Sequence, residues 1–205
     1  MNFFREISQK PWLTTDGPDR EIREPIAFAL PQATLGVRVL LLVISIIFSL
    51  FVIAYSDRML FHDWRAMPEP WLLWVNTLML ICASVALHGA TLSARQKSRD
   101  DLQARLWVAA AFSIAFLGGQ ALVWRELFML GYFADSNPAN AYFYLLTGLH
   151  GLHLLGGLGA LSLTVTRFYG GAKTDQLERS VDLCAVYWHY LLVVWLIVFG
   201  LLLFT

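Results

Sequence analysis

The chain has 205 residues, of which 58% are hydrophobic and 15% charged, and its formal net charge at pH 7 is zero. Such an apolar composition excludes an ordinary soluble domain and predicts an integral membrane protein. The balanced charge also lacks the basic excess of nucleic-acid-binding proteins, and the sequence carries neither a glycine-rich phosphate loop nor a GxSxG motif. We therefore expect membrane lipids and membrane proteins as partners, and no nucleic acid.

Five apolar runs are each long enough to cross a bilayer, which takes about 20 helical residues. They predict an all-α fold, a polytopic membrane helix bundle of five transmembrane helices within residues 34–205. The preceding residues 1–33 are polar and contain four prolines, and we interpret them as a cytoplasmic tail lying at the membrane surface. The predicted spans are 34–55, 70–93, 104–132, 139–167 and 179–204.

The distribution of lysine and arginine predicts the orientation of these spans. The side of the N-terminus and of the second and fourth loops carries eleven of them: Arg5, Lys10, Arg20, Arg23, Arg95, Lys97, Arg99, Arg105, Arg167, Lys173 and Arg179. The opposite side carries only Arg58 and Arg65. We therefore expect the N-terminus in the cytoplasm and the C-terminus outside.

An arginine and a glutamate follow one another inside the third span, in "VWRELFML". Ionisable groups at this depth are costly and by default suggest function. Arg125 and Glu126 diverge by about 100° around the helix, so each needs a partner from elsewhere. We expect the histidines of the fourth span to be the partners of Glu126. The alternative is that Arg125 extends outward to the membrane surface and Glu126 makes one structural hydrogen bond.

Two histidines, His150 and His153, lie near the middle of the fourth span in "YFYLLTGLHGLHLLGGLGAL". Their spacing places them on nearly the same helix face, and Thr147 adds a hydroxyl one turn away. A metal or haem site is conceivable for histidines at this spacing, but no carboxylate lies one turn away on the same helix. We favour hydrogen-bonded histidines at a tight helix interface. Small residues predict that another helix approaches this face closely: Gly148, Gly151, Gly156, Gly159 and Ala160.

The remaining histidines and the cysteines give weaker signals. His189 lies in the fifth span among aromatic residues, in "VYWHYLLVVW". His88 lies near the inner end of the second span, where it could reach the lipid headgroups. Cys82 and Cys184 form no CxxC pair, so we interpret them as packing residues and not as metal ligands.

These motifs resemble a known family. The string "FYLLTGLHGLHLLGG" followed by "YWHYLLVVWL" is similar to subunit III of haem-copper oxidases, the cytochrome c and quinol oxidase subunit 3 family. "WVNTLMLICASVALHGA" and the segment from Gln120 to Glu126 resemble the same family. The resemblance covers residues 34–204 and implies the short bacterial form with five helices.

The resemblance implies an accessory subunit with no catalytic, cofactor-binding or metal-binding residue of its own. Haem and copper are then expected in the partner subunits I and II of a proton-pumping terminal oxidase, which reduces oxygen to water in aerobic respiration. A small subunit IV or a respiratory supercomplex are further candidate partners. The resemblance also implies bound phospholipid, support of proton uptake, and a place in the bacterial cytoplasmic (inner) membrane with the C-terminus periplasmic or extracellular.

Three positions depart from the pattern of the family. Ile46 and Leu192 stand where many members carry a glutamate on the first helix and an aspartate on the last. Val123 stands where some members have a second glutamate. A proton-related role for the glutamate of the first helix therefore does not carry over to this chain.

Three alternatives remain open from the sequence. The chain could accompany a nitric oxide reductase, whose associated subunit shares the fold, and either cytochrome c or quinol could be the electron donor of an oxidase. A bis-histidine haem carrier would use His150 or His153 together with His189. A transporter is disfavoured by five spans without an internal repeat.

Overall fold

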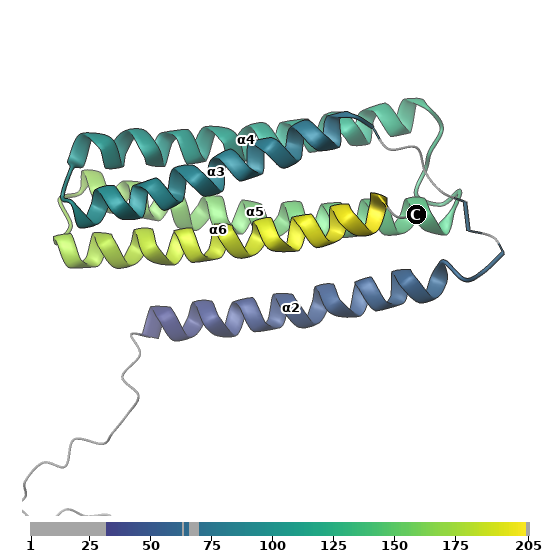
Figure 1. Cartoon of the computed structure of the whole chain (residues 1–205), viewed down its shortest axis with the longest axis horizontal. Helices are drawn as coiled ribbons and strands as arrows, with labels where there is room; N and C mark the ends of the chain where they lie inside the picture. Colours follow the sequence, from purple (N-terminus) through teal and green to yellow (C-terminus); the bar gives the residue numbers. More distant parts are fainter. Residues whose placement is uncertain (1–31, 63, 66–69, 204–205) are drawn as a thin grey trace, which may run out of the picture. The chain divides into compact units, whose positions relative to one another are not determined.

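The computed structural model describes residues 32–62, 64–65 and 70–203, so the predicted tail at 1–33 lies almost wholly outside the described residues. The described residues form helices and no strand, and each helix is long and apolar enough to cross a membrane. The prediction of an all-α membrane fold with five spans is confirmed. The helices are α2 (Gln32–Arg58), α3 (Leu72–Arg95), α4 (Arg99–Met129), α5 (Pro138–Tyr169) and α6 (Thr174–Leu203) (Figure 1).

The ends of α4 show why helix limits differ from the limits of the apolar runs. The helix begins at Arg99 and not at 104, because Asp100 and Asp101 in its first turn interact favourably with the helix dipole although they are not apolar. It ends at Met129, because Gly131 adopts a left-handed conformation with φ of 85°. The apolar run continues past this turn, but the helix does not.

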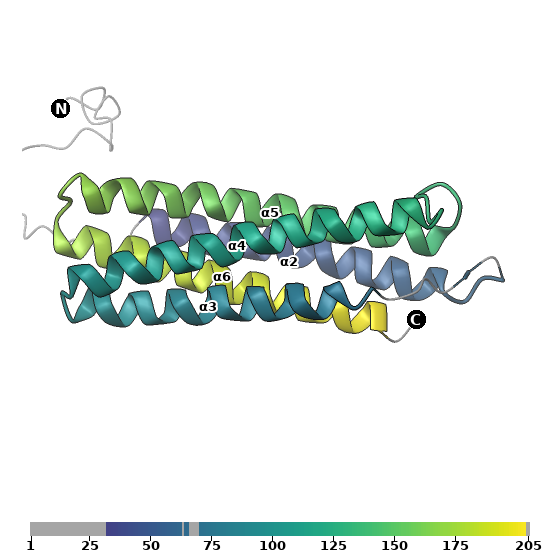
Figure 2. The same cartoon turned by 90° about the horizontal axis from the view of Figure 1, so that it is seen from above.

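Helices α3 to α6 form one antiparallel bundle (Figures 1 and 2). In it, α3 packs against α4 and α6, and α5 packs against the same two helices. Aromatic side chains fill the centre, where Phe116 meets Trp195 edge to face with ring centroids 4.8 Å apart. Trp188 and Phe143 are also fully buried. Large aromatic rings that interlock in this way fix the relative position of the helices.

Helix α2 stands apart from this bundle. No Cα atom of α2 lies within 8 Å of a Cα atom of another described helix. Three buried side chains, Ile44, Phe48 and Tyr55, connect α2 to its neighbours. The hydroxyl of Ser45 also shares a hydrogen bond of 2.8 Å with that of Tyr190 on α6. Because the backbone of α2 stays this far from the other described helices, α2 meets the bundle only through side chains.

Most of the described basic residues gather at one end of the bundle, which we call the basic end. It holds the start of α4 and α6 and the end of α3 and α5, and it is defined by Arg95, Lys97, Arg99, Arg167, Lys173 and Arg179. At this end Arg95 and Asp182 form an exposed ion pair with a nitrogen–oxygen distance of 3.5 Å.

Candidate functional site

His150 is the most enclosed ionisable group within the described residues, with no exposed surface. Its ring lies against Phe116 and Trp195, with centroid distances of 5.6 and 5.1 Å. Neither ring nitrogen has a hydrogen-bond partner among the described residues. His150 is therefore a packing residue of the aromatic core, and the prediction that it bonds to Glu126 is wrong.

Arg125 and Glu126 lie on the outer surface of α4, and both are exposed. The reason is the phase of the helix, since the neighbouring Val123 and Leu127 are fully buried and point into the bundle. With only four and three residues left before the end of α4 at Met129, the Arg125 and Glu126 side chains can extend toward that end. The structure brings neither of them to a histidine.

His153 faces a different neighbour from His150, although we expected nearly the same face. Its Nδ1 lies 2.7 Å from the carbonyl oxygen of Leu149, one turn back in α5. Its ring meets Phe48 of α2 with a centroid distance of 5.7 Å. A spacing of three residues leaves about 60° between two side chains, which here is enough to direct one into the core and the other toward α2.

Thr147 makes the polar contact between α4 and α5 that we had expected from Glu126. Its hydroxyl accepts a hydrogen bond of 3.0 Å from the indole nitrogen of Trp124 and donates to the carbonyl oxygen of Phe143. Two other tryptophans follow the same rule, with Trp188 donating to Ser113 and Trp195 donating to Thr77, each at 2.9 Å. These pairs were not predicted from the sequence.

The indole donors therefore hold the bundle together more than the histidines do. A buried indole nitrogen needs a hydrogen-bond acceptor. A tryptophan in the middle of one span and a serine or threonine on a neighbouring span could therefore have predicted these pairs from the sequence. A buried amide pair adds to them, since the Asn76 side chain donates to that of Gln120 across α3 and α4 at 3.3 Å.

His189 and His88 form a cluster that sequence analysis also missed. The Nδ1 atom of His189 shares a short hydrogen bond with the hydroxyl of Ser84 on α3. The His189 ring lies 5.9 Å from that of His88, centroid to centroid. His150 and His153 have other neighbours, so among the described residues neither of them meets His189, as the haem-carrier alternative requires.

Two apolar grooves separate α2 from α5 and α6. The larger has a volume of about 450 Å³ and runs between Val37 and Leu40 of α2 and the open surface at Gly156 and Ala160 of α5. At the basic end it reaches Arg167, whose guanidinium donates a hydrogen bond of 2.7 Å to Ser180.

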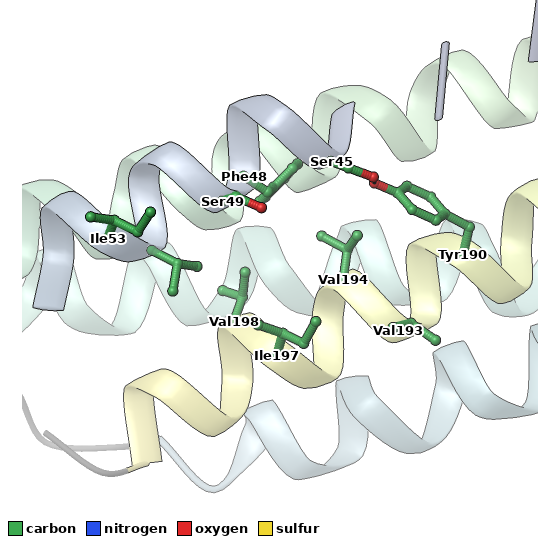
Figure 3. Close-up of a pocket in the computed structure, with 10 residues that line it drawn as sticks. Ser45, Phe48, Ser49, Ile53, Tyr190, Val193, Val194, Ile197 and Val198 are labelled. Atoms are coloured by element: carbon green, nitrogen blue, oxygen red, sulfur yellow. The ribbon is translucent and has the colours of Figure 1, made fainter. Parts of the chain in front are cut away.

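The smaller groove, of about 290 Å³, lies between α2 and α6 (Figure 3). Its wall is apolar except for the hydroxyls of Ser45, Ser49 and Tyr190. Both grooves are thus lined mainly by apolar side chains.

The small residues of α5 do not form one interface, contrary to our expectation. Gly148 and Gly151 meet side chains of α4 at ordinary contact distances, whereas Gly156 and Gly159 have no neighbour near the position of a Cβ atom. The close approach occurs at Gly157, where a Cβ atom would lie 2.8 Å from Tyr187 and 3.0 Å from Trp188. Only this glycine permits tight packing with α6, and Gly156 and Ala160 open the larger groove instead.

No three histidine, cysteine, aspartate or glutamate side chains gather closely enough to hold a metal ion within residues 32–62, 64–65 and 70–203. Cys82 and Cys184 are free thiols, and Cys184 lies 3.4 Å from the hydroxyl of Thr164. The prediction that haem and copper belong to other subunits is not tested by this and stays a prediction.

Comparison with known proteins gives the family. The model of the family described as cytochrome c oxidase subunit III matches residues 35–204. The chain is 33% identical over 129 residues to cytochrome c oxidase subunit 3 of Thermostichus vulcanus, which covers 62% of this chain and 63% of that relative.

Two further relatives show the breadth of the match. A probable cytochrome c oxidase subunit 3 of Mycobacterium tuberculosis is 31% identical over 130 residues, covering 62% of this chain and 63% of the relative. Cytochrome bo(3) ubiquinol oxidase subunit 3 of Pseudomonas aeruginosa is 28% identical over 125 residues, covering 61% and 60%. The aligned region is thus less than two thirds of each of these relatives, while the family model covers residues 35–204 of the 205 in this sequence. The chain belongs to the cytochrome c oxidase subunit III family.

Proposed function

We propose that the chain is the non-catalytic subunit III of a proton-pumping haem-copper terminal oxidase. The match of the family model to residues 35–204 carries this proposal. The internal polar groups support it, because they serve packing: His150 is enclosed by rings, and the tryptophans bond to hydroxyls. Partner subunits I and II hold the haem and copper, and this chain stabilises the catalytic subunit during turnover.

We propose that the chain spans the inner membrane of a bacterium. The basic end then faces the cytoplasm. The excess of lysine and arginine at this end supports the assignment. The C-terminus is then periplasmic or extracellular. In this orientation the subunit supports proton uptake from the cytoplasmic side, a role that follows from the resemblance to the family.

Bound phospholipid is the second part of the proposal. The larger groove offers apolar walls for acyl chains, and Arg167 lies at the depth of the headgroups if the basic end faces the cytoplasm. A guanidinium is a good partner for a phosphate because it donates several hydrogen bonds from a planar group.

Purification from native membranes through a tag on this chain tests the subunit assignment. We expect haem-copper subunits I and II among the co-purifying chains. Co-purification with nitric oxide reductase, or a chain that carries haem when isolated alone, would contradict the assignment. The identity of the co-purifying subunits also distinguishes a cytochrome c oxidase from a quinol oxidase.

Lipid analysis of the purified complex tests the groove. We expect Arg167→Gln to lower the amount of retained phospholipid. Arg179→Gln is the matched control, because Arg179 is exposed at the same end but does not line the groove. Equal retention in both variants would contradict the role of Arg167.

A further inference from the structure

Helix α3 exposes one narrow line of residues and buries or half-buries everything else. No two adjacent residues between Leu72 and Arg95 are exposed. The exposed ones begin at Trp74 and continue at alternating intervals of four and three: Leu78, Ile81, Val85, His88, Leu92 and Arg95. We call this line the α3 seam. In a left-handed pair of supercoiled helices, two residues in every seven of one helix face the other helix.

The other exposed helix surfaces are broader. In α2, the adjacent Leu42 and Val43 are both exposed, and in α4 the adjacent Ala121 and Leu122 are. A wide apolar surface fits many lipid chains, which need no particular register. The α3 seam is flanked by α4 and α6 and is one residue wide along its length.

A titratable group interrupts the apolar seam well inside the helix. His88 is exposed and lies seven residues before the end of α3 at Arg95, which is about 10 Å along the axis. We had expected that His88 could reach the lipid headgroups, but its short imidazole side chain cannot cover that distance, unlike the long side chain of Arg125 near the end of α4. An exposed polar group at this depth in hydrocarbon is unfavourable unless another molecule supplies a hydrogen bond.

Neighbouring polar groups extend this feature along α6. His189 lies beside His88, and Asp182 pairs with Arg95 one heptad closer to the basic end. The exposed Val186 lies between them on α6. The surface therefore offers apolar contact, a histidine pair within the span, and an ion pair at the edge, all in one line.

We infer that the α3 seam, flanked by Asp182, Val186 and His189 of α6, docks one transmembrane helix of another oxidase subunit. That helix carries a hydrogen-bonding side chain, a carboxylate, amide or hydroxyl, opposite His88. The single polar position fixes the register of the two helices, while the apolar positions supply the contact area. This inference rests on the proposed function, because it identifies the surface through which the subunit joins its complex.

Site-specific photo-crosslinking in the native complex tests the inference. A photoreactive phenylalanine analogue replaces Val85 on the seam or Leu155 on α5; these side chains are 65% and 55% exposed. The complex is purified through a tag on the catalytic subunit. We expect a crosslink from position 85 to another oxidase subunit and none from position 155.

Three results would overturn the inference. A crosslink from position 85 to a second copy of this chain would make the seam a self-association surface. Adducts with lipid alone at position 85, in a complex that contains the chain, would show that no helix docks on the seam. This result would leave the proposed function intact. Absence of the chain from the purified oxidase would remove the proposed function and the inference together.

Substitution of His88 distinguishes docking from folding. We expect His88→Ala to lower the association constant with the rest of the complex about three-fold, as for an average interhelical hydrogen bond in a membrane. His88→Gln retains a hydrogen-bonding side chain and should restore most of the loss. The isolated variants should unfold like the parent chain. Equal association of the parent and both variants would contradict the role of His88.

Discussion

Helices α2 and α3 are both transmembrane, yet their environments differ widely. Helix α2 has only three buried residues and no close backbone neighbour, and grooves separate it from α5 and α6. Helix α3 is buried or half-buried along its whole length except for one seam. The most apolar 18-residue segment of α2 has a mean hydropathy of 2.8, whereas that of α3 has a mean hydropathy of 1.7. Of these two helices, the more apolar one has fewer buried residues, whereas the small and polar residues of α3 accompany its contacts with α4 and α6.

The largest effect that we predict is on the stability of the bundle formed by α3 to α6. Trp195→Ala removes a fully buried ring that contacts Phe116 and His150 and bonds to Thr77. We expect a loss of about 3–5 kcal/mol in the free energy of unfolding, measured by chemical denaturation in detergent micelles.

The matched change in α2 is Phe48→Ala. Phe48 is also buried, but it faces the groove side of α2, so we expect a smaller loss than for Trp195→Ala. An equal loss in the two variants would show that α2 is as tightly integrated as α3, and would contradict the comparison.

Glycine substitutions in α5 give the second largest effect. Gly157→Val inserts side-chain atoms where Tyr187 and Trp188 already lie, and we expect a loss of about 1–3 kcal/mol in the free energy of unfolding. Gly159→Val is the matched control, because no atom lies near its Cβ position and its position is exposed. A similar loss in both variants would point to helix propensity and not to packing as the cause.

Double-mutant cycles should give a smaller effect. We expect Trp124→Phe and Thr147→Val to be coupled by about 0.6 kcal/mol, since each removes one side of the same hydrogen bond. Glu126→Ala and His150→Ala should be additive, because the exposed carboxylate and the enclosed imidazole do not meet. Coupling in the second pair but not in the first would contradict the placement of α4 against α5.

The smallest effect on stability is expected from Tyr190→Phe. It removes the hydrogen bond to Ser45 that connects α2 to α6, at a cost of about 0.6 kcal/mol or less. Its effect on the position of α2 should be larger. Spin labels on α2 and α6 should report a broader distribution of distances, whereas Tyr144→Phe, on the bundle side, should leave that distribution unchanged.

The sequence was sufficient for the number and nature of the helices, because each span is a long apolar run. It was less informative about their ends, since polar first turns such as that of α6 at Thr174 are helical without being apolar. It failed for the partner of His150. Whether Glu126 faces the bundle depends on the rotation of α4 as a whole, and that rotation is set by the packing of residues such as Val123 and Leu127.

The glycines of α5 illustrate the same difficulty. Their spacing predicted that another helix approaches this face closely, but a surface without bulky side chains can receive either a helix or a lipid chain. Gly157 receives α6, and Gly156 opens a groove. The distinction depends on which face of α5 each glycine occupies once the helix is packed in the bundle, which is a tertiary property.

The activity of the oxidase with and without this chain shows directly whether the chain is an accessory subunit. Oxygen consumption would be followed over many turnovers in the complex purified from a deletion strain, with its remaining subunits intact, and in the complex with the chain restored. We predict substantial initial activity in both and a faster decline without the chain. Immediate loss of all activity in the intact remainder would show that this chain carries an essential step, and an unchanged decline would show that it does not protect the catalytic subunit.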